Sequence, residues 1–97
     1  MATFIVLGNF TEQGIRSIKD SPKRSDAFKA MAKKAGVTVK DIYWTLGHYD
    51  IVTIVEAPDT ATATALGLAI ASLGNVRTET LTAFGPEEFG KILGKMP

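Results

Sequence analysis

The segment Gly47-His48-Tyr49-Asp50 gathers more chemically versatile side chains than any other part of this sequence. A tyrosine hydroxyl can donate a hydrogen bond and a carboxylate can accept one, so Tyr49 and Asp50 are candidate ligand-binding residues at the mouth of a pocket. The alternative is structural: Gly47 forms a turn that a Cβ would resist, Asp50 bonds turn N–H groups, and the ring of Tyr49 packs. His48, the only histidine, is a candidate base or a metal or haem ligand, or else a solvated surface residue.

A second polar group lies near the C-terminal end of the chain. Arg77 and Glu79 are two residues apart in a β-rich stretch, so their side chains share one face of a strand. If that face points inward, we expect them either to pair with each other or to bind a polar ligand; the remaining alternative is that they are exposed on an edge of the sheet. The neighbours Tyr43 and Trp44 point to opposite faces of another strand, one toward the core and the other toward a cavity. The candidate ligand-binding residues are therefore Tyr43, Trp44, Tyr49, Asp50, Arg77 and Glu79, and the candidate catalytic proton acceptors are His48, Asp50 and Glu79.

Composition narrows the chemistry that these side chains can support. The 97 residues contain no cysteine, which excludes disulfides, thiolate metal sites and cysteine catalysis. A single histidine excludes a multi-histidine metal site within one chain, and no phosphate-binding glycine motif is present, so we expect neither a metal nor a cofactor. No apolar run reaches the roughly 18 residues of a membrane span, and no basic leader precedes the first strand. We therefore expect a small soluble cytoplasmic protein that does not associate with membranes.

The charge distribution is uneven although the net charge is only +1. Seven of the eleven basic side chains lie between residues 16 and 34. This pattern indicates a solvated helix face or, alternatively, a site for an anionic partner. Nucleic acid is not an expected partner, because no aromatic side chains are interleaved with the basic ones for base stacking.

Hydrophobic periodicity predicts the elements that must position these residues. Residues 2–10 read as a buried strand. Thr11 can cap a short helical turn, which Gly14 weakens, so we expect an irregular segment to about Asp20. Ser21 as N-cap and Pro22 as first residue start a helix that ends at Gly36. The remaining expected elements are strands at 37–46 and 51–56, a helix at 61–73 capped by Asp59 or Thr60, a strand at 76–84, and an amphipathic tail with Phe89, Ile92 and Leu93 on one side.

This order predicts one α+β domain over residues 1–97, with the ferredoxin-like βαββαβ arrangement. Right-handed crossovers place both helices on one face of a four-stranded antiparallel sheet, and a short C-terminal helix follows. Alternation puts apolar side chains on both sheet faces, including Ile5, Leu7, Val52 and Ile54 on one of them. A large uncovered apolar face is uncommon in monomers, so we expect a homodimer in which two sheets pack face to face.

Four stretches in order resemble the GYD domain family. They are residues 18–24, residues 43–50 with the Gly-x-Tyr-Asp signature at Gly47, Tyr49 and Asp50, residues 55–59, and residues 72–80. The resemblance implies a dimeric α+β barrel, the superfamily of small monooxygenases, muconolactone isomerases and haem-dependent chlorite dismutases. The signature leaves position 48 variable, which argues against haem ligation by His48. The family supplies no activity that can be carried over.

Three functions are compatible with these observations. The leading one is a homo-oligomer that binds a small molecule in a pocket at the sheet or at the dimer interface. The second is a cofactor-free oxygenase or isomerase that uses His48, Asp50 or Glu79 as proton acceptor. The third is a structural module that assembles into a larger oligomer.

Overall fold

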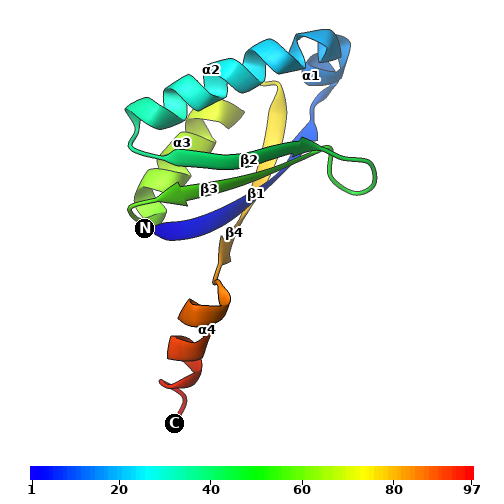
Figure 1. Cartoon of the computed structure of the whole chain (residues 1–97). Coiled ribbons are helices and arrows are strands. Elements are labelled where there is room, and N and C mark those ends of the chain that lie inside the picture. Colours follow the sequence, from blue (N-terminus) through cyan, green and yellow to red (C-terminus); the bar gives the residue numbers. More distant parts are fainter.

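The computed structural model describes all residues, 1–97, and its centre is a four-stranded antiparallel sheet (Figure 1). The strands are β1 (Ala2–Phe10), β2 (Thr38–Trp44), β3 (Ile51–Ala57) and β4 (Val76–Ala83), in the spatial order β2-β3-β1-β4. The ferredoxin-like prediction is thus confirmed, and the predicted strand limits hold to within two residues. β1 and β3 form the centre of the sheet, and β2 and β4 form its edges.

Two helices, α2 (Ser21–Lys34) and α3 (Thr60–Ala71), cover one face of the sheet (Figure 1). The Asp59 carboxylate caps α3 by accepting a 2.7 Å hydrogen bond from the Thr62 N–H. Hydrogen bonding from Thr62, through its side chain and its N–H, holds the pKa of Asp59 below its ordinary value. At the end of α2, Gly36 adopts the left-handed conformation (φ +79°) that was expected there.

The start of α2 differs from the prediction. Residues 11–20 are not irregular: they form α1 (Glu12–Arg16) and a 3-10 turn, η1 (Ile18–Asp20), which runs directly into α2. Asp20 therefore occupies the N-cap position and Ser21 is already helical. The preceding turn supplies helical backbone geometry one residue before Pro22, so Ser21 does not act as N-cap.

Gly14 allows α1 to pack against the turn between α3 and β4. A Cβ at Gly14 would lie 2.0 Å from the carbonyl oxygen of Asn75, a distance that no side chain tolerates. The Thr11 hydroxyl accepts a hydrogen bond from Gly14 N (3.1 Å) and donates one to the Gly74 carbonyl (2.5 Å). Residues that are distant in sequence are thereby joined at the end of the sheet where α2 begins.

The hydrophobic core lies between the sheet and the two helices. Phe4 and Val55, on the central strands, are its largest fully buried side chains. Ala32 on α2 and Ala63 and Leu66 on α3 pack over them. The small alanines allow both helices to approach the sheet closely.

None of the helices has the length and apolar character of a membrane span.

The opposite sheet face carries no helix. The strand register aligns Leu7 with Val52 and Glu79, and Ile5 with Ile54 and Leu81. We call the apolar group Ile5, Leu7, Val52, Ile54 and Leu81 the open face. The last element, α4 (Pro86–Leu93), follows β4 and projects from the body on the side away from α2 and α3 (Figure 1).

Candidate functional site

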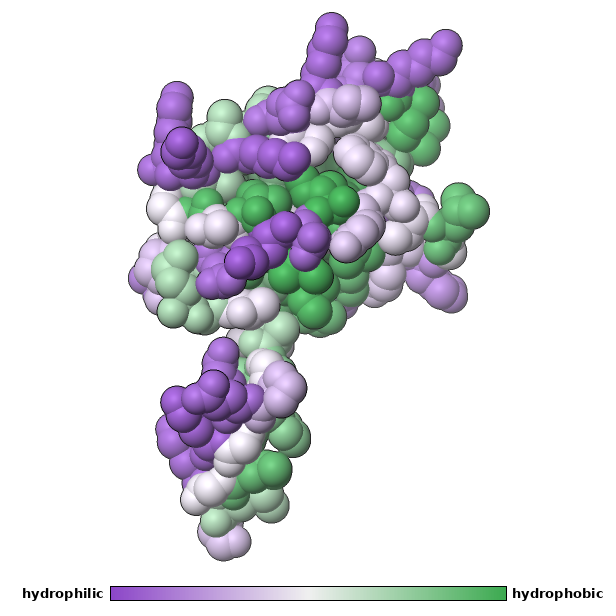
Figure 2. Space-filling view, in the orientation of Figure 1, coloured by the Kyte–Doolittle hydropathy of each residue, from purple (hydrophilic) through white to green (hydrophobic).

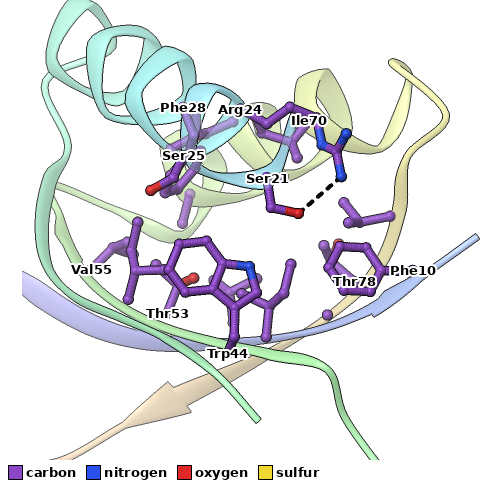
Figure 3. Close-up of a pocket in the computed structure, with 18 residues that line it drawn as sticks. Phe10, Ser21, Arg24, Ser25, Phe28, Trp44, Thr53, Val55, Ile70 and Thr78 are labelled. Carbon is purple, nitrogen blue, oxygen red and sulfur yellow. Dashed lines mark hydrogen bonds between the residues drawn. The ribbon is translucent and has the colours of Figure 1, made fainter. Parts of the chain in front are cut away.

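A cavity of about 120 Å³ lies between the covered sheet face and the helices α2 and α3 (Figure 3). All four strands contribute to its lining, and eleven of its eighteen lining residues are hydrophobic. The aromatic rings of Phe10, Phe28 and Trp44 and the side chain of Ile70 surround it (Figure 3). The site is thus suited to a molecule with a largely apolar surface.

Gly8 forms the floor of this cavity. It lies on the central strand β1, between Ile51 of β3 and Thr78 of β4 in the register. Its strand neighbours on the same face, Val6 and Phe10, both present side chains to the cavity, whereas Gly8 presents none. A Cβ built at Gly8 would make only ordinary contacts, at 3.6 Å or more. The space is therefore left open by the glycine, and a larger residue could occupy it without backbone strain.

Few polar groups face the cavity. Thr53 lines it and is only 6% exposed. Arg24 is also at the cavity wall, but it donates to the Ser17 carbonyl (2.9 Å), to the Ser21 hydroxyl (3.2 Å) and to the Gly14 carbonyl (3.4 Å). Arg24 thus ties α2 to α1, and Thr53 is a buried hydroxyl-bearing side chain at the cavity wall.

Trp44 stands at the open side of the cavity. It is 48% exposed, and its indole lies across the space below α2 (Figure 3). A polar groove between α2 and β2 shares Ser25, Ile42 and Trp44 with the cavity, which identifies this side as the entrance. Tyr43 points to the opposite face, as expected, and is 54% exposed. The expectation that one of these two aromatics belongs to the core is wrong: both lie near the end of the edge strand β2 and are about half-exposed.

Asp50 is held by the end of β1. Its carboxylate accepts a 2.9 Å hydrogen bond from the Phe10 N–H, and its own N–H donates to the Gly8 carbonyl at 2.8 Å. The alternative that Asp50 bonds N–H groups of its own turn is therefore corrected: the bonds run to the neighbouring strand. Gly47 has a φ of +117°, which agrees with the alternative that this glycine forms a turn that a Cβ would resist. His48 is exposed.

Tyr49 and Glu79 meet on the side of the open face. The Tyr49 hydroxyl donates a 2.6 Å hydrogen bond to the Glu79 carboxylate. This bond, and then the negative charge of Glu79, raise the pKa of Tyr49 above its ordinary value. The alternative that Arg77 pairs with Glu79 is wrong, since Arg77 forms no ion pair and Tyr49 occupies the carboxylate instead.

The residues selected from the sequence therefore fall in two places. Trp44 alone lines the cavity, whereas Tyr43, Tyr49, Arg77 and Glu79 lie on the other side of the sheet. None of the proposed proton acceptors, His48, Asp50 and Glu79, lines the cavity. Sequence reasoning missed Gly8 and Thr53. A glycine inside an otherwise bulky apolar strand was the signal that could have found the cavity.

Comparison with known proteins places the chain among relatives. A family model described as GYD domain matches residues 4–93. The chain is 40% identical, over 84 residues, to a Thermus thermophilus protein named "glutamine synthetase and cystathionine beta-lyase binding protein", covering 86% of this chain and 88% of the relative.

Two solved structures share the fold. The crystal structure of TTHA0845 from Thermus thermophilus superposes with a TM-score of 0.57 at 29% identity, covering 88% of this chain and 95% of that one. A feast or famine regulatory protein from M. tuberculosis, complexed with L-methionine, superposes with a TM-score of 0.66. Its 18% identity supports the fold alone, and the match covers 88% of this chain but 51% of that protein. Because the family model spans nearly the whole domain, the chain belongs to the GYD domain family.

Proposed function

We propose that this protein is a homodimer that binds a small, mostly apolar molecule in the cavity between the sheet and the helices. The space above Gly8, beside the buried Thr53, is the observation that carries this proposal. The Thr53 hydroxyl can donate a hydrogen bond to one polar group of the ligand or accept one from it. The ligand would enter beside Trp44.

The cavity limits the size and charge of this ligand. At about 120 Å³ it is close to the roughly 150 Å³ cavity that takes up benzene in an engineered protein. Arg24 is the charged residue of the lining, and its guanidinium is already engaged by α1 and Ser21. A neutral single-ring or branched aliphatic molecule with one hydroxyl or carbonyl group fits both limits.

Trp44, the only tryptophan, allows a direct test. Titration with phenol, anisole and benzyl alcohol should change its fluorescence and raise the melting temperature. Gly8→Leu should weaken binding at least tenfold by filling the floor of the cavity, without lowering the stability of the free protein. Thr53→Val, which keeps the shape but removes the hydroxyl, should weaken phenol binding and leave toluene binding almost unchanged.

Gly85→Leu is the matched control, because Gly85 lies in open space and outside the cavity. It should bind these compounds like the unmodified chain. If none of the compounds alters the fluorescence or stability of the unmodified protein at millimolar concentration, the cavity is not a binding site for molecules of this class.

The homodimer part of the proposal rests on the open face. Its apolar centre is covered by no element of the same chain, and Leu81 is 44% exposed. A second copy related by a two-fold axis would present the same patch and cover it. In this arrangement Tyr49 and Glu79 would lie near the interface, whereas the cavity would remain on the far side of each sheet.

A second candidate function is binding to another enzyme. The observation that favours it is the 40% identity to a relative whose name states that it binds glutamine synthetase and cystathionine β-lyase. Cosedimentation with each purified enzyme tests this directly. Gly8→Leu should not affect such a complex if the outer surface is used, and should abolish it if the cavity accepts a segment of the partner.

A further inference from the structure

The C-terminal helix α4 lacks a packing partner. It makes no substantial contact with the sheet or with any other helix of its own chain. In Figure 1 it projects beyond the end of β4, and the molecule is elongated, with extents of 50 × 31 × 19 Å. An isolated helix of eight residues is not stable in water, so α4 needs a surface on which to pack.

The side chains of α4 define which of its faces needs to be covered. The stripe consists of Phe89, Ile92 and Leu93, at i, i+3, i+4 spacing on the helix, and of Met96, three residues after its end; all four are between 37% and 68% exposed. Figure 2 shows the two sides of this segment, one hydrophilic and one hydrophobic. The hydrophilic side carries both acidic and basic residues, Glu87, Glu88 and Lys91, so it is not the basic surface that anionic lipids attract.

Exposed apolar side chains also lie along the chain between the open face and α4. Leu81 at the end of β4 and Phe84 just after it are 44% and 53% exposed, and they connect the sheet to α4. Together with Tyr43 and the four stripe residues, they make seven large side chains that are about half-exposed. At roughly 200 Å² for each fully exposed side chain, this is roughly 700 Å² of surface. A standard interface buries about 800 Å² per partner.

We propose that α4 is an arm that packs on a second copy of this chain, and that the two-fold dimer is closed by two such arms. Five of the seven exposed side chains belong to the arm and to Phe84, so a second copy that covered the sheet alone would leave most of this surface in water. The inference rests on the proposed homodimer and adds the surface that determines its affinity. A two-fold axis supplies both arms with equivalent acceptor surfaces.

Two double variants of α4 test the arm. Phe89→Gln with Leu93→Gln removes apolar side chains from the stripe. Glu87→Gln with Lys91→Gln is the control, because it introduces two glutamines on the hydrophilic side instead. Neither double variant changes the net charge. Sedimentation from micromolar to submillimolar concentration should show a dimer dissociation constant at least tenfold higher for the stripe variant and unchanged within twofold for the control.

Hydrogen exchange of the α4 amides provides the second readout. In the unmodified chain they should be protected at concentrations where the dimer forms and unprotected after dilution. Protection that does not depend on concentration would mean that α4 folds back on its own sheet, and a dimer with unprotected α4 amides would mean that the arm is free. Either result contradicts the proposal that α4 packs on a second copy. If the dimer persists and the stripe variant dissociates no more readily, the arm is wrong but the homodimer stands. A chain that is monomeric at submillimolar concentration overturns both.

Phenol binding followed by Trp44 fluorescence separates the arm from the cavity. Residues 86–97 do not line the cavity, so the stripe variant should bind phenol like the unmodified chain. A loss of phenol binding in the stripe variant would show that α4 completes the cavity of the partner, which contradicts an arm that acts only in association.

Discussion

The two faces of the sheet carry side chains of similar type but differ in what lies over them. On the covered face, Phe4 and Val55 are 1% and 2% exposed because α2 and α3 pack on them. On the open face, Ile5 and Leu7, from the same central strand, are only partly buried. Apolar residues in a strand thus indicate that a sheet face should be covered. Which of the two faces is covered within the same chain depends on where the helices pack.

Polar chemistry divides between the faces in the same way. The covered face offers hydroxyl groups such as that of Thr53, and its one charged neighbour, Arg24, is engaged through both of its terminal nitrogens by hydrogen bonds. The other side of the sheet holds the ionisable pair Tyr49 and Glu79 and the unpaired Arg77. Water, or a partner, can solvate charges there, while the enclosed face can keep only neutral groups at low cost.

The largest expected effect compares two phenylalanines. Phe4→Ala should lower the free energy of unfolding by about 3–5 kcal/mol, because it leaves a cavity in a fully buried core. Phe84→Ala, at a side chain that is 53% exposed, should change the stability of the isolated subunit by less than about 1 kcal/mol. Urea denaturation at a protein concentration that favours the monomer measures both. Equal losses would mean that α4 and Phe84 pack onto their own subunit.

Asp50 gives an intermediate effect, because it joins the loop between β2 and β3 to β1. Asp50→Ala should cost about 2 kcal/mol, since the part-buried Phe10 N–H loses a charged acceptor. Asp50→Asn keeps an oxygen acceptor and should cost less than half of that. His48→Ala, at an exposed position in the same loop, is the control, and its unfolding midpoint in urea should not move. An equal shift of the unfolding midpoint for Asp50→Ala and His48→Ala would contradict the role of Asp50 in joining the loop to β1.

The fold could be predicted from the sequence to a large extent, because its signals are local. Alternation of apolar residues identified four strands, and Asp59 and Gly36 marked helix limits where their side chain or backbone is needed. The second strand ends at Trp44 rather than at residue 46, because Leu46 is fully exposed and the Thr45 N–H bonds to Asp50 across the loop.

The site could not be predicted to the same extent, because it depends on contacts between distant segments. The Tyr49–Glu79 bond joins residues thirty positions apart, and it requires the register between β1 and β4 as well as the loop geometry. The cavity depends on the gap between the sheet and the helices α2 and α3 at Gly8, which has no side chain to fill it. Hydrophobic pattern places each of these elements on a face but does not give the space that remains between them.

The smallest expected effect concerns the ionisation of Tyr49. In a Tyr43→Phe background, where Tyr49 is the only tyrosine, tyrosinate absorbance should appear above the ordinary value of about 10. Glu79→Gln removes the charge that opposes ionisation and replaces the carboxylate by a weaker acceptor, so the pKa of Tyr49 should fall toward its ordinary value. A tyrosine whose pKa is raised by folding adds stability that is full below the unfolded pKa and is lost as pH rises through the folded pKa. As the pH rises above about 10, the unmodified chain should therefore lose slightly more stability than Glu79→Gln.

Arg77→Gln serves as the control for this titration, because Arg77 lies on the same strand face as Glu79 but does not contact the carboxylate through an ion pair. It should leave the Tyr49 titration nearly unchanged. Superimposable titration curves for Glu79→Gln and the unmodified chain would mean that the Tyr49–Glu79 bond does not persist in solution. The Lys40–Glu56 ion pair (3.3 Å) would then be the remaining organised polar contact of β3 on the open side.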